Sequence, residues 1–166
     1  VGVDHVEMVM ERGGELTGEP TGFRDLDDLT GGFQRGELIV IAARPSMGKT
    51  ALALNIARNG PVSHRQKVAV FSLEMTKRSL LLRLLASEAQ VNMTSFRKGY
   101  GNAEDYKKIQ RAANRLSDAT IWMDDSGTIT ILEIKARCRR LKSEHGLGTN
   151  SAWWIAERAE GKGLEA

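Results

Sequence analysis

Cysteine, aromatic residues and long apolar runs are scarce in this 166-residue sequence. The single cysteine, Cys138, excludes an internal disulfide and fits a reducing compartment. Aromatic residues make up only 5% of the chain, so a buried core must be mainly aliphatic. No apolar run approaches the ~18 residues that a membrane-spanning helix needs, and the acidic residues Asp4 and Glu7 argue against a secretory signal at the start. We therefore expect a cytoplasmic protein with no membrane partner.

What remains is an ordinary globular composition. Hydrophobic residues account for 41% of the chain and charged residues for 27%, and the length suits one domain. The formal net charge of +3 permits contact with polyanions without requiring it.

The most informative stretch is an apolar run followed by a short loop that ends in Gly-Lys-Thr. Residues 38–42 are apolar throughout, which predicts a strand covered on both faces. Residues 51–58 read as a helix, so strand, loop and helix N-terminus together predict a phosphate-binding loop. The residues that would surround the phosphates are Ala43, Arg44, Pro45, Ser46, Met47, Gly48, Lys49 and Thr50.

Three residues of this loop have distinct expected roles. Gly48 allows the backbone to close around an anion, Lys49 would reach the β- and γ-phosphates, and the Thr50 hydroxyl would bind Mg²⁺. Ala43 stands where the usual pattern has glycine, and it is the mildest replacement. ATP and Mg²⁺ are therefore the expected ligands.

A second apolar run, residues 68–73, predicts another core strand, and Glu74 follows it. Ligands in open α/β sheets lie beyond the carboxyl ends of the strands, so Glu74 and the loop should share an edge. A carboxylate there could activate a water for attack on the γ-phosphate. A helix-capping or solvated glutamate is the alternative.

The remaining elements are read from capping residues and periodicity. Thr76, Asn102 and Thr130 are expected to cap helices, the last with Glu133 in a capping box, and we expect Asn59-Gly60-Pro61 to end the helix after the loop. Residues 119–125 predict a third strand that ends in Asp124 and Asp125. Two questions stay open. Residues 1–12 are either a surface helix or the end of a linker. Several cations are either solvated or in contact with DNA; they are Arg97, Lys98, Lys135, Arg139 and Lys142.

A glycine-rich lead-in precedes the first predicted strand. Its apolar residues are expected to be buried beneath residues 38–42; they are Phe23, Leu26, Leu29 and Phe33.

These motifs together closely resemble the C-terminal motor domain of DnaB-type replicative DNA helicases. The matching runs are Pro20-Thr21-Gly22-Phe23, Leu26-Asp27, Gly31-Gly32-Phe33, residues 43–50, Phe71-Ser72-Leu73-Glu74-Met75 and the basic helix at residues 134–142. The resemblance covers about residues 14–148, and it also accounts for the alanine at position 43.

The resemblance implies a RecA-like P-loop NTPase core, an α/β fold with a mostly parallel sheet and helices on both faces. It implies an ATP-dependent helicase with Lys49 and Glu74 as catalytic residues, acting as a hexamer on single-stranded DNA at the replication fork, within the bacterial nucleoid. The primase and a helicase loader are the partners that the family implies in a primosome. We expect single-stranded DNA binding by this fragment to be weak.

The resemblance stops near Gly148, where the family continues with a strand that ends in a metal-binding aspartate. We therefore expect a linker helix at residues 1–14, a partial core at residues 15–148 that is incomplete at its C-terminal side, and an atypical tail at residues 149–166, foreign or frame-shifted. Two alternatives to a working motor stay open. One is a nucleotide-binding or assembly module without turnover, and the other is a RecA-, RadA- or KaiC-like ATPase.

Overall fold

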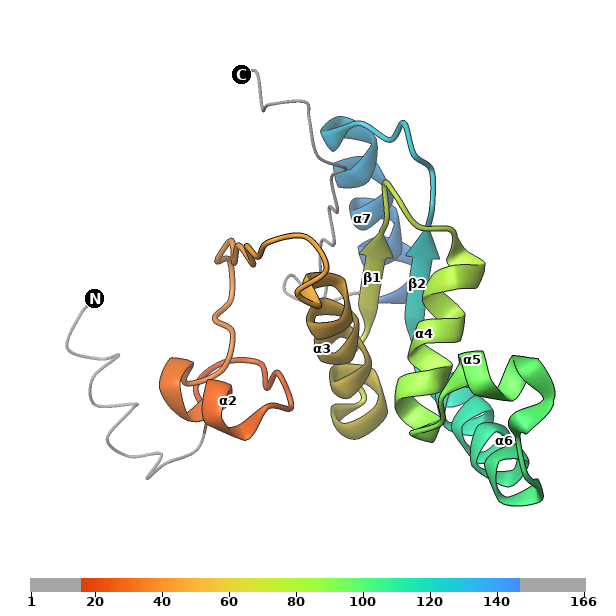
Figure 1. Cartoon of the computed structure of the whole chain (residues 1–166). Helices are drawn as coiled ribbons and strands as arrows, with labels where there is room; N and C mark the ends of the chain where they lie inside the picture. The colour runs from red at the N-terminus through yellow and green to blue at the C-terminus, as the bar shows by residue number, and fades with distance from the viewer. Residues whose placement is uncertain (1–15, 147–166) are drawn as a thin grey trace.

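The computed structural model describes residues 16–146, so the predicted linker helix and the tail lie outside the described residues. Helices surround a small sheet (Figure 1). No helix within residues 16–146 is long and apolar enough to cross a membrane. In chain order the elements are α2 (Arg24–Thr30), α3 (Lys49–His64), β1 (Val68–Phe71), α4 (Lys77–Ala89), α5 (Met93–Ser95), η1 (Phe96–Tyr100), α6 (Ala103–Asp118), β2 (Ile121–Asp124) and α7 (Ile131–His145).

The sheet is parallel, with β1 paired to β2 from Val68 opposite Ile121 to Phe71 opposite Asp124. All four residues of β1 are buried, because helices cover both of its faces. Val68 and Val70 pack with residues of α3 and α4, whereas Ala69 and Phe71 pack with Ile134 of α7. The predicted α/β layering is therefore confirmed in this part of the chain, and the two strands are shorter than the apolar runs suggested.

The helix starts follow the predicted capping residues. The Thr76 hydroxyl accepts a hydrogen bond from the Ser79 N–H, and Asn102 and Thr130 each form a capping box with the residue three positions on. The predicted end of α3 is wrong, because the helix continues through Pro61 to His64 and ends at Arg65 in the left-handed region. Gly60 and Pro61 are buried, so packing outweighs the helix-breaking tendency of this pair.

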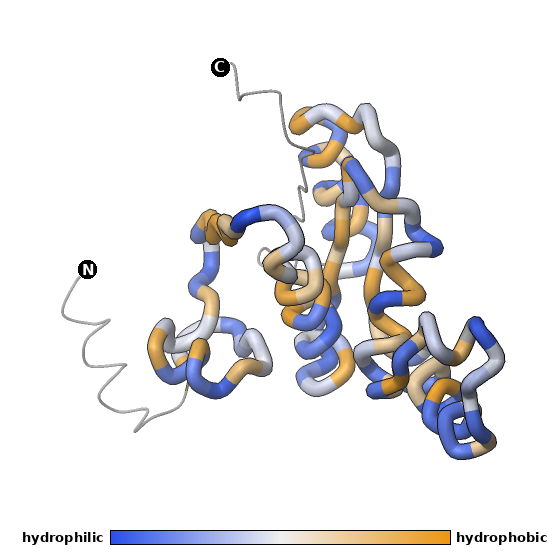
Figure 2. The backbone as a smooth tube through the Cα atoms, viewed as in Figure 1, coloured by the Kyte–Doolittle hydropathy of each residue, from blue (hydrophilic) through white to orange (hydrophobic). Residues whose placement is uncertain are grey.

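The predicted strand at residues 38–42 is absent, and this is the main correction to the sequence analysis. Leu38 is 84% exposed and Val40 is 78% exposed, and neither β1 nor β2 pairs with this stretch. Figure 2 shows the apolar residues of this stretch apart from the sheet. A strand needs the backbone of a neighbouring strand for its hydrogen bonds. The sheet within residues 16–146 contains β1 and β2 alone, and neither pairs with residues 38–42.

The lead-in is held by polar contacts more than by the apolar burial we expected. Phe33 is buried, Phe23 and Leu26 are half-buried, and Leu29 is 85% exposed, so the expectation for Leu29 is wrong. Burial beneath a strand at residues 38–42 is also wrong, because that stretch forms no strand. The buried carboxylate of Asp27 accepts hydrogen bonds from the Thr21 N–H (2.8 Å), the Thr21 hydroxyl (2.7 Å) and the Gly22 N–H (3.1 Å). The Asn59 side chain then donates to the Thr21 carbonyl at 3.0 Å, which ties the lead-in to α3.

Candidate functional site

The predicted phosphate-binding loop forms a compact turn ahead of α3. The Met47 N–H donates to the Arg44 carbonyl at 3.3 Å, and Ser46 and Gly48 have φ angles of +63° and +85°. Gly48 is the N-cap of α3, in a left-handed conformation that glycine adopts without strain. Residues 43–48 are all exposed, so the loop is open to a ligand.

The N-terminus of α3 has the features of an anion site. No side chain caps it, and within residues 16–146 the N–H groups of Gly48 and Lys49 have no protein acceptor. A Cβ atom built on Gly48 would meet nothing within 4 Å, so the space in front of the turn is clear. Uncapped amides and the positive end of the helix dipole favour a bound phosphate. Lys49 is half-buried and Thr50 is buried in the first turn of the same helix.

Glu74 lies at the same edge of the fold. Because α3 packs on β1 and runs in the opposite direction, the N-terminus of α3 and the carboxyl end of β1 face the same side (Figure 1). Glu74 is an exposed residue in the bend that joins β1 to α4. The structure therefore brings the loop and Glu74 to one edge; their catalytic and ligand-binding roles stay predictions.

Two contacts hold the segment that carries Glu74. The buried Ser72 hydroxyl accepts a hydrogen bond from the Met75 N–H at 2.9 Å. At the other end, the Asp125 carboxylate accepts from the Lys77 N–H at 2.9 Å and lies 3.6 Å from the Lys77 ammonium. The backbone hydrogen bond from Lys77 is the main reason why the pKa of Asp125 is lowered, against a smaller opposing effect of burial. Sequence reasoning missed both anchors.

Asp124, the other acid at the end of β2, is held by contacts within the fold. Its carboxylate forms an ion pair with Arg137 of α7 and accepts a hydrogen bond from the Ser126 N–H at 3.0 Å. The sequence analysis left the role of Asp124 open. Its contacts now explain it as the link between β2 and α7.

Helix α7 presents the cations of the basic stretch to solvent. Lys135, Arg139 and Lys142 are exposed, as is Lys98 within η1. Cys138 lies on the inner side with Leu141, packed against the cluster of Ala69, Phe71 and Ile134. Burial raises the pKa of the Cys138 thiol, which favours a small apolar role over a nucleophilic one.

Comparison with known proteins decides the family. The model of the DnaB-like helicase C terminal domain matches residues 18–150, most of the chain. The chain belongs to the DnaB-like helicase C-terminal domain family. It is 50% identical over 145 residues to the replicative DNA helicase DnaB of Geobacillus stearothermophilus, an alignment that covers 87% of this chain and 32% of the relative. The resemblance seen in the sequence is thereby confirmed.

Other relatives extend this match. The replicative DNA helicase DnaC of Bacillus subtilis is 48% identical over 145 residues, which cover 87% of this chain and 32% of that protein. DnaB of Leifsonia xyli is 39% identical over 166 residues, which cover 100% of this chain and 36% of the relative. The chain thus spans about a third of the length of these relatives. The origin of residues 149–166 stays a prediction.

Solved structures support the RecA-like assignment of this DnaB-like domain. One solved ATPase domain superposes with a TM-score of 0.82 at 29% identity, covering 95% of this chain and 55% of that one. A DnaB-like replicative helicase, solved in a study of its interactions with primase, superposes with a TM-score of 0.80 at 28% identity. That match covers 96% of this chain and 40% of the other. The predicted RecA-like α/β core is confirmed.

Proposed function

We propose that this DnaB-like domain is the nucleotide-binding part of a replicative helicase motor that hydrolyses MgATP. In the parent protein, hydrolysis would drive travel along single-stranded DNA and separation of the duplex. The observation that carries this proposal is the uncapped N-terminus of α3, with its clear space in front of Gly48 and with Glu74 at the same edge. Family membership supports nucleotide use.

We assign a different role in ATP binding and hydrolysis to each residue of the site. The N–H groups of Gly48 and Lys49 and the Lys49 ammonium hold the phosphate oxygens and offset their charge. The Thr50 hydroxyl would hold Mg²⁺, which would supply further charge neutralisation. Glu74 orients a water and accepts its proton. Ser72 and Asp125 fix both ends of the Glu74 segment, so the carboxylate has little backbone freedom to lose when the site closes.

We infer the partners, the oligomeric state and the cellular location of the parent protein from its relatives. A DnaB-like helicase has been solved in a study of its interactions with primase, and we extend that partner to the parent of this chain. A hexamer, a helicase loader and action at the replication fork in the bacterial cytoplasm complete the proposal. Because the family is DnaB-like, the RecA-, RadA- or KaiC-like alternative is not retained.

A second candidate is a nucleotide-binding module without turnover. The observation that favours it is the open site, in which residues 43–48 are exposed and residues 38–42 pair with no described strand. In P-loop ATPases an arginine from a second subunit can contribute about 10³ to 10⁵ in rate. A lone chain that binds ATP without hydrolysing it fits this candidate.

Single-turnover ATP hydrolysis, with and without single-stranded DNA, separates the two candidates. A working motor predicts DNA-stimulated turnover that Lys49→Ala abolishes, whereas the module predicts binding without turnover. Glu74→Gln should keep ATP binding and lose hydrolysis, while Glu37→Gln, which changes another exposed glutamate, should alter neither. Unchanged turnover in Glu74→Gln would remove Glu74 from the mechanism.

A further inference from the structure

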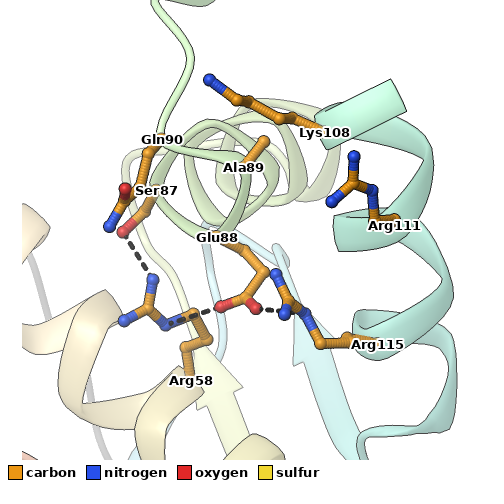
Figure 3. A pocket seen from close by; sticks show the side chains of 8 residues that line it. All are labelled: Arg58, Ser87, Glu88, Ala89, Gln90, Lys108, Arg111 and Arg115. Carbon is orange, nitrogen blue, oxygen red and sulfur yellow. Dashed lines mark hydrogen bonds and ion pairs between the residues drawn. The ribbon is translucent and has the colours of Figure 1, made fainter. Parts of the chain in front are cut away.

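A second site of a different kind lies at the far end of α3. A cavity of about 380 Å³ opens where α3, α4 and α6 meet, and Figure 3 shows its lining. Its volume falls within the ~300–1,000 Å³ typical of small-ligand pockets. Arg58 lies nine residues along α3 from Lys49, so about 13 Å of helix separates the cavity from the loop. The lining residues are Arg58, Ser87, Glu88, Ala89, Gln90, Lys108, Arg111 and Arg115.

The lining is strongly positive. It contains four cationic side chains and one carboxylate, Glu88, which leaves a surplus of three positive charges. Glu88 is largely buried and is already engaged, because it lies 2.7 Å from Arg115 and 3.4 Å from Arg58. Figure 3 shows the two arginines reaching Glu88 from α3 and α6 on either side of α4. This pairing joins three helices and offsets the charge at the base of the cavity.

The other two cations of the lining, Lys108 and Arg111, are called the rim pair here, and their charges are poorly neutralised. Arg111 lies 3.6 Å from Glu104, but both side chains are more than half exposed, so solvent screens this pair. Within residues 16–146 no carboxylate lies within ion-pair distance of the Lys108 ammonium. Lys108, Arg111 and Arg115 are spaced three and four residues apart, so they form one stripe of α6 that faces the cavity.

The chemistry of the lining selects the ligand. Among the described residues no aromatic side chain lines the cavity, so this part of the chain offers no platform on which a nucleobase could stack. A single carboxylate would offset only one of the three surplus charges, whereas a phosphate group carries about −1.5 to −2 and accepts hydrogen bonds through three oxygens. Arg58 and Arg115 are engaged with Glu88, and the Ser87 hydroxyl donates to Asn55 Oδ1. The donors that remain for a ligand are the Lys108 ammonium, the Arg111 guanidinium and the Gln90 amide. We propose that this cavity binds a compact polyphosphate group without a nucleobase, such as inorganic pyrophosphate.

Calorimetric titration of inorganic pyrophosphate into the full chain tests this proposal. The titration uses the Lys49→Ala background without Mg²⁺, so that the loop before α3 contributes little. We expect saturable binding that Lys108→Ala combined with Arg111→Ala weakens by at least about tenfold. The control pair, Lys107→Ala with Arg139→Ala, removes the same charge from exposed positions outside the cavity and should leave the affinity within about twofold.

Several results would overturn the proposal. These are no binding in the Lys49→Ala background, no loss in the rim pair, or an equal loss in the control pair. A single-stranded oligonucleotide or an acidic peptide that binds more tightly than pyrophosphate, with loss in the rim pair alone, would assign the cavity to a macromolecule instead. Circular dichroism confirms folding of each variant, and Arg58, Glu88 and Arg115 stay unchanged throughout. Since no step uses ATP hydrolysis, failure here is distinct from failure of the proposed motor function.

Discussion

The two halves of the nucleotide site differ in how they are held. The segment with Glu74 emerges from a buried strand and is anchored by Ser72 and Asp125. The phosphate-binding loop emerges from residues 38–42, which are largely exposed and unpaired in the described sheet. An apolar sequence therefore does not form a strand by itself; it needs a neighbouring strand to pair with. The difference predicts that substitutions in the two regions will have very different costs.

The largest expected effect is in the core between the sheet and α4. Leu80 is fully buried there, so Leu80→Ala should lower the free energy of unfolding by about 2–5 kcal/mol. Leu38→Ala makes the same change at an exposed site and should cost less than about 0.5 kcal/mol. Urea denaturation followed by circular dichroism measures both. Equal losses would show that residues 38–42 are buried after all.

The second-largest loss of stability is expected at the buried carboxylate of Asp27 in the lead-in. Asp27→Asn replaces an acceptor of three hydrogen bonds with a group that can accept fewer, and we expect a loss of about 1–3 kcal/mol in the free energy of unfolding. Asp28→Asn alters the exposed neighbour in α2 and serves as the control. The same denaturation experiment applies, and a similar effect of both changes would contradict the role of Asp27.

Disrupting the ion pairs that join α3, α4 and α6 should lower the free energy of unfolding by a somewhat smaller amount. Glu88→Gln removes the charge between Arg58 and Arg115, and we expect a loss of about 1–2 kcal/mol in the free energy of unfolding. Glu104→Gln removes an exposed partner of Arg111 and should cost less than about 0.5 kcal/mol. A stabilised Glu88→Gln variant would mean that desolvation of the pair outweighs its attraction.

The smallest effect concerns the pH dependence of the anchor beside Glu74. Folding lowers the pKa of Asp125 below its ordinary value of 3.8. Its contribution to stability is therefore present above that value and is lost as the pH falls through the folded-state pKa. Wild type should melt above Asp125→Asn at pH 6, and the difference should shrink toward zero in strong acid. A difference that stays constant with pH would exclude the charged form of Asp125 as the anchor.

Local features of this chain could be predicted from the sequence, because neighbouring residues determine them. Thr76, Asn102 and Thr130 each bond to a backbone N–H three residues away, and the capping pattern is visible in the sequence. Residues 68–71 are also correctly predicted as a strand, because the unbroken apolar run of a strand buried on both faces is visible in the sequence. The continuation of α3 through Pro61 depends on its burial, which local propensity does not report.

The candidate site could be predicted in outline only. Sequence spacing brought the loop and Glu74 to one edge, since βα connections in parallel sheets impose this arrangement. The hydrogen bond between Ser72 and Met75 spans three residues and is a local contact that the sequence reasoning did not consider. The contact between Asp125 and Lys77 joins residues 48 positions apart, so nothing in the local pattern indicates it. The cavity at Glu88 likewise depends on the packing of three helices. Such features follow from tertiary contacts between residues far apart in the chain.

The central claim is that the turn ahead of α3 holds the phosphates of ATP. Equilibrium titration of a fluorescent ATP analogue with Mg²⁺ tests it most directly, in wild type, Lys49→Ala and the control Lys135→Ala, which changes an exposed lysine of α7. The account predicts that Lys49→Ala weakens binding by at least about tenfold and that Lys135→Ala leaves it unchanged. Equal affinity of all three proteins would contradict it.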